Sequence, residues 1–226
     1  MATIAFDSIS HAFGERRVLQ DVSLTLTEHR IGIVGANGSG KSTLVRLING
    51  LITPQRGRVS VDGVDVSRHA REVRRRVGFV FTNPDNQIVM PTVEEDVAFT
   101  LRRRGLSKDQ IAERTALTLE RFGLAAHAAH PAHRLSGGQK QLLALAAVLV
   151  AEPDVVIADE PTTLLDARNA RQIGELLQSL PQQLIVVTHQ LDLLADFDRV
   201  IVIEEGRVAV DGAPAVALDA YRALLA

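Results

Sequence analysis

The sequence predicts an α/β fold in which a parallel β-sheet leads into a phosphate-binding loop. Three apolar runs, of the kind found in strands that are buried on both faces of a parallel sheet, predict the sheet. These runs are Val77–Phe81, Val155–Ala158 and Leu184–Val187. The strand expected at Arg30–Val34 precedes a glycine-rich segment that fits the pattern G-x-x-x-x-G-K-[ST]. The segment consists of Gly35, Ala36, Asn37, Gly38, Ser39, Gly40, Lys41, Ser42 and Thr43.

This glycine-rich segment predicts a binding site for a nucleoside triphosphate. Its backbone N–H groups can bind phosphate oxygens, and a helix expected from about Lys41 adds the positive end of its dipole. We expect Lys41 to neutralise charge on the β- and γ-phosphates and Ser42 to ligate Mg²⁺. The alternative is a glycine-rich turn with a surface lysine. The strand before the segment and the helix after it argue against that alternative.

Segments outside the parallel sheet are expected to form antiparallel strands. The segments that alternate or cluster apolar residues between turn formers are Thr3–Phe6, Val22–Thr27 and Arg58–Val61. Residues 200–210, around Glu205 and Gly206, predict a closing hairpin. A C-terminal helix is expected from Pro214 onward.

The segment from Asn83 to Val150 changes to helical patterns. Thr92 with Glu95, and Ser107 with Gln110, fit the capping box that satisfies free N–H groups at a helix start. Apolar residues follow both boxes at helical spacing, as expected for helices with one buried face. In the first helix these are Val93, Val97, Ala98 and Leu101, and in the second Ala112, Ala116 and Leu119.

The composition limits the number of domains and excludes several kinds of partner and chemistry. The 226 residues suffice for one α/β domain with a substantial core, and the 27 acidic and 25 basic residues nearly cancel. No global positive field favours nucleic acid as a partner. The chain has no cysteine, which excludes disulfides and thiol catalysis. The longest apolar run, residues 142–151, is half of what a membrane span needs, and residues 1–11 lack a secretory signal, so we expect a cytoplasmic location.

Two acidic residues end one of the buried strands. Asp159 is placed to reach a metal ion through water, and Glu160 to orient and deprotonate an attacking water. An ordinary acidic pair at a strand exit is the alternative. The apolar run before the pair and Pro161-Thr162 after it favour the catalytic interpretation.

Three segments in order extend the pattern beyond a generic nucleotide site. Ser136, Gly137, Gly138 and Gln139 follow Leu135, and the apolar run that ends at Glu160 is followed by Val187-Thr188-His189. In motif identity, order and spacing the chain resembles the ATP-binding cassette (ABC) ATPases over nearly its whole length. The resemblance implies a P-loop NTPase with a RecA-like core, an antiparallel β-subdomain and an inserted helical subdomain. It implies one domain over 1–226, with the core and β-subdomain at 1–82 and 151–226 and the helical subdomain at 83–150.

The resemblance also assigns roles to individual residues. It implies that Ser136, Gly137, Gly138 and Gln139 contact the γ-phosphate held by a second cassette, so that ATP binding with Mg²⁺ produces a homodimer. A simple serine cap at Ser136 is the alternative. It implies a γ-phosphate sensor at His189, where a satisfied hydrogen-bonding histidine is the alternative. Asp166 matches a dimer-crossing loop, although Thr163-Leu164 departs from the small residues usual there.

One aromatic residue near the N-terminus has a role of the same kind. Phe13 matches the aromatic residue that stacks on adenine in this family. A phenylalanine in the hydrophobic core is the alternative.

Residues 77–87 and 92–99 narrow the resemblance to the ATPase subunits of energy-coupling factor (ECF) importers. The Asn-Pro-Asp-x-Gln run at 83–87 carries it, whereas Thr82 stands where most members have a glutamine that approaches Mg²⁺. The resemblance implies a peripheral place at the cytoplasmic face of the membrane, with a transmembrane coupling subunit and a substrate-binding membrane subunit as partners. The coupling subunit is expected to dock on Gln87, Glu94, Glu95 and Asp96. A solvated acidic first helical turn is the alternative for the three carboxylates.

The transported solute and two further functions stay open at this point. Thr82 and the end of the chain at Ala226 favour the biotin importers among ECF systems, and cobalt and nickel importers are the alternative. A soluble ABC ATPase acting on nucleic acid or ribosomes would carry coiled-coil insertions, a duplicated cassette or basic arms, and none is visible. A regulatory module without turnover conflicts with Glu160 and His189.

Overall fold

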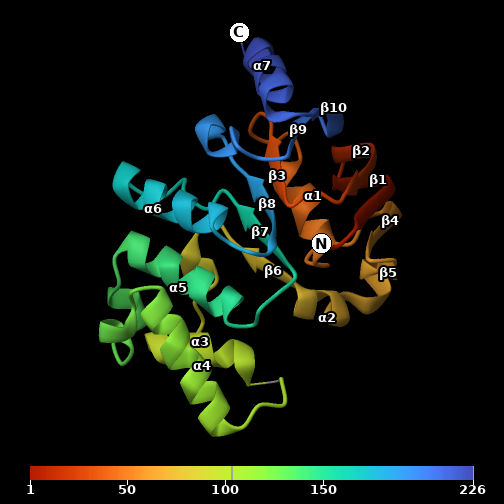
Figure 1. Cartoon of the computed structure of the whole chain (residues 1–226). Coiled ribbons are helices and arrows are strands. Elements are labelled where there is room, and N and C mark those ends of the chain that lie inside the picture. The colour runs from red at the N-terminus through yellow and green to blue at the C-terminus, as the bar shows by residue number, and fades with distance from the viewer. Residues whose placement is uncertain (103, 226) are drawn as a thin grey trace. The chain divides into compact units, whose positions relative to one another are not determined.

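The computed structural model describes residues 1–102 and 104–225 (Figure 1). The chain forms two compact units. The first comprises Met1–Gly78, Asp154–Glu160 and the segment from Leu180 onward, and the second comprises Phe79–Pro153 and Pro161–Ser179. The division means that the first 78 residues and the segment from Leu180 onward share one core, and that most of the helical region has its own.

A six-stranded sheet forms the centre of the first unit. Its strand order is β10-β9-β3-β8-β7-β6, and β3, β7, β8 and β9 run parallel. Every residue of β7 and β8 is buried, which confirms the strands predicted from the continuous apolar runs. The strands are β3 (Arg30–Val34), β6 (Val77–Val80), β7 (Val155–Asp159), β8 (Gln183–Val187), β9 (Arg199–Glu204) and β10 (Arg207–Gly212).

Helices of the first unit follow these strands. Helix α1 (Lys41–Ile48) follows β3, and the short 3₁₀ helix η4 (Leu191–Leu194) follows β8. Strands β9 and β10 form the predicted hairpin, whose turn places Glu205 and Gly206 at positive φ. Helix α7 (Pro214–Leu225) packs on these two strands, as expected from Pro214 onward.

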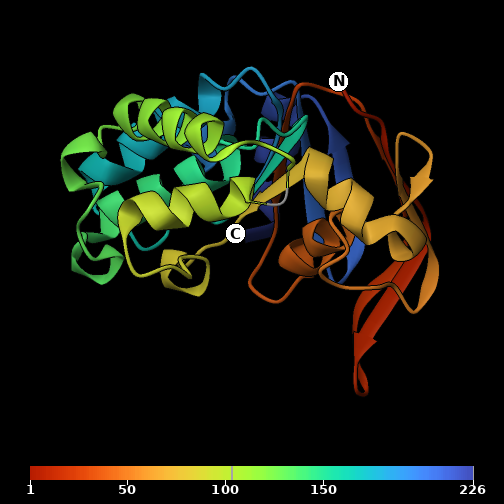
Figure 2. The same ribbon diagram turned by 90° about the horizontal axis from the view of Figure 1, so that it is seen from below.

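An antiparallel sheet of order β2-β1-β4-β5 completes the first unit. Its strands are β1 (Ile4–Phe13), β2 (Arg16–Leu26), β4 (Arg56–Val61) and β5 (Val64–Asp65). The β1–β2 hairpin extends well past the predicted strand ends and projects as a long ribbon (Figure 2). The alternation that predicts strands fails there because register shifts and positive φ at Ser8 and Asp21 interrupt the pleat.

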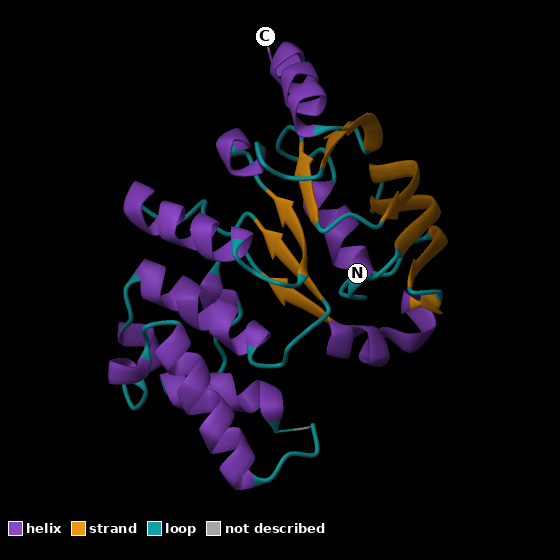
Figure 3. Cartoon of the chain, viewed as in Figure 1, coloured by secondary structure: helices purple, strands orange, loops and turns teal. Residues whose placement is uncertain are grey.

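The second unit is built mainly from helices (Figure 3). The helices are α3 (Val93–Leu101), α4 (Lys108–Arg121), α5 (Gly137–Leu149) and α6 (Ala167–Gln178), with 3₁₀ turns η1 (Pro84–Asn86), η2 (Ala125–His127) and η3 (Ala132–Arg134). Both predicted capping boxes are present, at Thr92 and at Ser107. Helix α3 packs against α4 and α5, with Val93, Val97 and Leu101 fully buried.

Two helices were not predicted from the sequence. Helix α2 (Val66–Arg76) buries only Val66 and Val73, and α6 buries only Ile173, Gly174 and Leu177. Both helices are amphipathic, but each carries only two or three large apolar residues, which form a short stripe to recognise in the sequence. The available signal is the N-cap, because the carboxylates of Asp65 and Asp166 accept N–H groups of the first turns. In the part of the chain that the structure describes, none of the helices has the length and apolar character that crossing a bilayer requires.

Candidate functional site

The phosphate-binding loop lies between β3 and α1 and is shaped by three glycines. Gly35, Gly38 and Gly40 have φ angles of 150°, 80° and 109°, which residues other than glycine rarely adopt. A Cβ atom on Gly35 would lie 2.1 Å from the Ile203 carbonyl oxygen, and one on Gly40 would lie 2.6 Å from that of Val18. Buried backbone therefore fixes the path of the loop.

The loop leaves polar groups that suit an anion. Its N-cap, Gly40, gives helix α1 no side-chain cap, so the free N–H groups of the first turn face the loop. Ser39 is buried, and its Oγ has no hydrogen-bond partner among the described residues. The Ser39 carbonyl accepts an N–H from Gly206 at 3.0 Å, which ties the loop to the β9–β10 turn. These groups fit nucleotide phosphates.

Lys41 is folded onto this loop. Its Nζ donates to the carbonyl oxygens of Gly35 at 2.8 Å and Ala36 at 3.0 Å. Burial lowers the pKa of Lys41, and the carboxylates of Glu160 and Asp159 partly offset that shift. The ammonium group therefore lies inside the loop, on the side from which phosphate oxygens would be bound.

Two of the three residues predicted to reach Mg²⁺, Ser42 and Asp159, lie together, and the third is Thr82. Ser42 Oγ donates to Asp159 Oδ1 at 2.8 Å, and an Arg46 guanidinium nitrogen donates to Oδ2 at 3.1 Å. Burial raises the pKa of Asp159, against the opposing effects of Ser42 and Arg46. A hydroxyl and a carboxylate are the oxygen donors that Mg²⁺ takes, so these residues fit the ion. Arg46 was missed from the sequence, although it lies one helical turn after Ser42.

Glu160 and His189 form a second pair on neighbouring strand ends. His189 Nδ1 lies 2.8 Å from Glu160 Oε2, with side chains 56% and 16% exposed. Glu160 has φ of 53°, and its backbone N–H donates to Val187 O at 2.9 Å. A carboxylate only accepts hydrogen bonds, so Nδ1 of His189 carries the proton of this contact.

Phe13 ends β1 and is 55% exposed. This exposure excludes the alternative of a core phenylalanine. Its ring makes an edge contact with His11, with ring centroids 4.8 Å apart. Nearby, Arg16 donates to the carbonyl of Gly38 at 3.4 Å, so the hairpin that carries Phe13 also touches the phosphate loop. No motif in the sequence pointed to Arg16.

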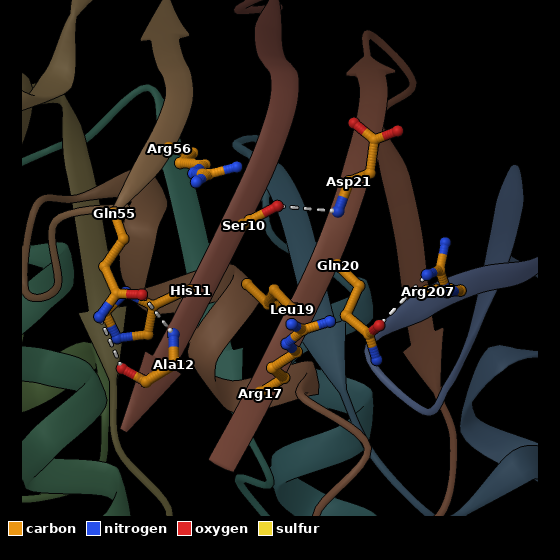
Figure 4. A pocket seen from close by; sticks show the side chains of 10 residues that line it. All are labelled: Ser10, His11, Ala12, Arg17, Leu19, Gln20, Asp21, Gln55, Arg56 and Arg207. Atoms are coloured by element: carbon orange, nitrogen blue, oxygen red, sulfur yellow. Dashed lines mark hydrogen bonds between the residues drawn. The ribbon is translucent and has the colours of Figure 1, made fainter. Parts of the chain in front are cut away.

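A cavity of about 410 Å³ opens on the antiparallel sheet (Figure 4). The oxygen and the nitrogen of the Gln55 side-chain amide each form a hydrogen bond of 3.1 Å with the backbone of Ala12. These two bonds close one side of the cavity. The predicted site residues do not line this cavity. The residues that line it are Ser10, His11, Ala12, Arg17, Leu19, Gln20, Asp21, Gln55, Arg56 and Arg207.

The signature segment 136–139 and Asp166 lie in the second unit, whereas the phosphate loop lies in the first. Ser136 caps α5 in a full capping box with Gln139, so the serine-cap alternative holds locally. Gly137 is exposed with open space around it, whereas a Cβ on Gly138 would meet the Asn169 side chain at 2.5 Å. Ser136 and Gly137 are therefore exposed, whereas Gly138 is buried.

The loop with Asp166 presents an apolar side chain to solvent. Leu164 is 61% exposed, and Asp166 caps α6 by accepting the N–H of Asn169 at 2.9 Å. That N–H group lowers the pKa of Asp166.

Amide side chains hold the loop that follows β6. Gln87 Oε1 accepts the N–H of Phe81 at 3.0 Å, and Gln87 Nε2 donates to Ala144 O at 3.1 Å. Asn83 Oδ1 accepts the N–H of Asp85 at 2.9 Å. Both amides are thus engaged within the second unit, and half-buried Thr82 stands at the position of the expected glutamine.

The three acidic residues of the first α3 turn differ from one another. Glu94 is exposed, whereas Glu95 completes the capping box by accepting the hydroxyl and N–H of Thr92. Asp96 is 3% exposed, and its carboxylate accepts the N–H groups of Val89 and Met90. Burial raises the pKa of Asp96. Asp96 therefore holds the preceding loop, and Glu94 and Glu95 border a cavity of about 570 Å³ between α3 and α4.

Known proteins are similar to this chain in sequence and in fold. The profile of the family described as ABC transporter matches residues 19–163. The biotin transport ATP-binding protein BioM of Rhizobium etli is 47% identical, over 99% of both chains. The energy-coupling factor transporter ATP-binding protein EcfA1 of Listeria monocytogenes is 40% identical, over 93% of this chain and 79% of that protein.

A solved structure supports the same assignment. The protein cbiO1 of Clostridium perfringens, described as part of the ABC transporter complex cbiONQ, superposes with a TM-score of 0.84 and 32% identity. The superposition covers 98% of this chain and 92% of that one. The predicted fold class and the resemblance to the ECF ATPase subunits are confirmed. The chain belongs to the ABC transporter family and is an ABC ATPase.

Proposed function

We propose that this ABC ATPase powers an ECF-type membrane importer by hydrolysing MgATP between two copies of the chain. The observation that carries the proposal is the arrangement of the first unit. The half-buried hydroxyl of Ser42 bonds to the buried carboxylate of Asp159 beside a glycine loop. The Glu160–His189 pair lies where the neighbouring strands β7 and β8 end. This is the set of groups that phosphoryl transfer to water requires.

Each residue of the first unit has a proposed task in that reaction. Lys41 transfers its hydrogen bonds from the Gly35 and Ala36 carbonyls to phosphate oxygens. Ser42 and Asp159 hold Mg²⁺, which neutralises charge on the phosphates. Glu160 accepts a proton from the attacking water, and His189 fixes the orientation of that carboxylate.

His189 also faces the transferred phosphoryl group in this proposal. Its Nδ1–H is engaged by Glu160, so Nε2 can donate to a phosphate oxygen only when the ring carries two protons. Phe13, which is exposed at the end of β1, stacks on the adenine base. These roles make the site sensitive to the charge state of one histidine.

A second copy of the chain completes the site. The outward-facing cap at Ser136, with Gly137, Gly138 and Gln139, donates to the γ-phosphate bound by the partner, because first-turn N–H groups attract anions. Asp166 and exposed Leu164 meet the partner across the two-fold axis. We propose the division 1–82 and 151–226 for the nucleotide-binding part and 83–150 for the helical part.

Membrane subunits dock on the helical part. Glu94 is exposed beside an apolar cavity, which suits a short partner helix that carries an arginine, because arginine binds carboxylates with two hydrogen bonds. We propose that the chain sits peripherally at the cytoplasmic face, on a transmembrane coupling subunit that joins a substrate-binding membrane subunit. Biotin is the proposed solute because of the likeness to BioM, and cobalt or nickel is the alternative.

A Glu160→Gln variant tests the composite site. This variant keeps the nucleotide ligands and loses the proton acceptor, so it should bind MgATP, hydrolyse it slowly and accumulate as a dimer. Light scattering with and without MgATP measures the dimer directly. A variant that binds MgATP and remains monomeric at all protein concentrations would contradict the composite site.

Single charge reversals test the docking surface. Glu94→Lys should abolish co-purification with the membrane subunits while ATP affinity stays within about twofold, because Glu94 lies outside the phosphate site. Glu113→Lys is the matched control, since Glu113 is an exposed carboxylate of α4 that does not border the cavity. Equal loss of the complex in both variants would contradict the assignment of the docking surface to Glu94.

A further inference from the structure

Three polar side chains connect the segment before the signature loop to the loop itself. His127, at the end of η2, places its Nδ1 3.0 Å from Nδ1 of His130. His127 Nε2 lies 3.1 Å from Nε2 of Gln139, and Gln139 Oε1 accepts the backbone N–H of Ser136 at 2.9 Å. All four residues belong to the second unit, so the chain of contacts lies within one compact body.

The chemistry of the donors and acceptors fixes which group donates in each hydrogen bond of this series. The backbone N–H of Ser136 can only donate, so the Gln139 oxygen faces it and the Gln139 amide N–H₂ group faces His127. His127 Nε2 must then be an unprotonated acceptor. A neutral His127 therefore carries its proton on Nδ1 and donates to His130 Nδ1, which leaves the proton of a neutral His130 on Nε2.

A second proton on either imidazole ring breaks this series of hydrogen bonds. A proton on His130 Nδ1 turns that atom into a donor, so His127 must accept there and carry its own proton on Nε2. His127 Nε2–H would then oppose the Gln139 N–H₂ group, and only a flip of the amide would remove the conflict. The flip would place N–H₂ against the Ser136 N–H, which loses one of the two hydrogen bonds of the capping box.

We propose that His127 and His130 are positioning residues for ATP hydrolysis: in their neutral forms they hold Gln139, and through it the Ser136 cap, in the geometry the partner's nucleotide requires. The inference rests on the proposed contact of the signature segment with the partner's γ-phosphate. It predicts a loss of signature geometry on acidification, because histidine side chains change charge between about pH 5 and 8.

Other titratable groups on the elements around the pair are already engaged or face solvent. The Glu95 carboxylate accepts from Thr92, and Lys140 pairs with Asp85 at 2.7 Å. No third His, Cys, Asp or Glu among the described residues completes a three-ligand metal site with the pair. The charged or titratable side chains on the adjoining segments are Glu94 and Glu95 of α3, Glu120 and Arg121 of α4, His133 and Arg134 of η3, and Lys140 of α5.

Nitrogen-15 NMR of the imidazole rings of the full-length protein tests the hydrogen-bond chain without any assay of function. At pH 7.5 the proposal predicts the proton of His127 on Nδ1 and that of His130 on Nε2. A proton on Nε2 of His127 at that pH would overturn the proposal. Because the measurement uses the nucleotide-free protein, this result is independent of whether the MgATP-bound dimer of the proposed function exists.

The pH profile of ATP hydrolysis tests the effect on the reaction. His127→Gln supplies an acceptor for Gln139 that does not titrate, so its rate relative to wild type should rise about fivefold from pH 7.5 to pH 5.5, the effect of regaining one helix cap. His127→Ala should be about fivefold slower than wild type at pH 7.5. His133→Ala is the matched control, because the ring of exposed His133 makes no hydrogen bond to the described residues.

Two outcomes would overturn the positioning role. One is a ratio of the His127→Gln rate to the wild-type rate that does not change with pH. This outcome is decisive because the glutamine supplies an equivalent acceptor, so the variant folds with Gln139 held in place. The other is equal activity of His127→Ala and His133→Ala at pH 7.5. A wild-type protein that shows the predicted tautomers but forms no dimer with MgATP would instead contradict the proposed function.

Discussion

The phosphate loop and the signature loop are both glycine-containing segments that lead into a helix, yet different forces hold them. Backbone packing fixes the phosphate loop, where a Cβ on Gly35 or Gly40 would collide with carbonyl oxygens of other strands. Side-chain hydrogen bonds fix the signature loop, where Ser136 and Gln139 cap each other and His127 supports Gln139. Gly137 there has open space on all sides.

This difference separates two kinds of control over one reaction. Both ends of the phosphate loop are packed into the buried core, so its geometry follows the fold and changes only when the fold is strained. The signature loop depends on a few surface hydrogen bonds, each of which contributes about 1 kcal/mol. We therefore expect surface side chains to adjust the signature loop, whereas the phosphate loop is either formed or lost.

The largest expected effect compares one substitution in each loop. Gly35→Ala should abolish ATP binding and lower the free energy of unfolding by about 2 kcal/mol or more, because its Cβ has no space and its φ is strained. Gly137→Ala should change the free energy of unfolding by less than about 0.5 kcal/mol. Urea denaturation and nucleotide titration of the two variants measure both effects. Equal destabilisation by both substitutions would remove the distinction between the loops.

A tenfold effect is expected at Thr82, in the loop after β6. Asn83 and Gln87 are engaged in backbone hydrogen bonds, so we propose that Thr82, rather than either of them, substitutes for the missing glutamine. Thr82→Ala should slow ATP hydrolysis about tenfold, or ~1.4 kcal/mol of barrier, while Thr82→Gln should preserve or raise the rate. Steady-state ATPase of the assembled transporter measures this. A Thr82→Gln variant far slower than Thr82→Ala would contradict the substitution of one side chain for the other.

A smaller effect concerns pH and the core of the phosphate site. Burial raises the pKa of Asp159 above its unfolded value, so the folded state binds that proton more tightly than the unfolded state does. The free energy of unfolding should therefore fall as pH rises through the raised pKa, and Asp159→Asn should be free of this loss. Urea denaturation of both proteins from pH 4 to 8 should show a stability difference that grows with pH in favour of Asp159→Asn. A difference that stays constant, or that shrinks as pH rises, would contradict the burial argument.

The sequence predicted those parts of the molecule whose local pattern agrees with the final packing. The buried strands, the phosphate loop and the capping boxes at Thr92 and Ser107 each leave a short-range signature, and all are present. Helices α2 and α6 escaped prediction because each buries only two or three residues, so few large apolar residues mark their amphipathic pattern. The extent of the β1–β2 hairpin escaped because its bulges break the alternation of side chains.

The individual contacts at the candidate site depend on tertiary structure. Nothing in the local sequence brings Arg46 to Asp159, or His127 to Gln139, since these contacts depend on how elements pack. The docking prediction treated the three carboxylates of the first α3 turn alike. The fold separates them into an exposed Glu94, a capping Glu95 and a buried Asp96.

Disulfide trapping tests most directly the claim that the two loops meet across a dimer. The chain has no cysteine, so Asn37→Cys and Gly137→Cys each introduce a single thiol at an exposed position of one loop. Mixed in equal amounts and oxidised mildly, the two variants should form a disulfide-linked heterodimer with MgATP and little without it. Linkage that is absent with MgATP, or equally strong without nucleotide, would contradict a site shared between two chains.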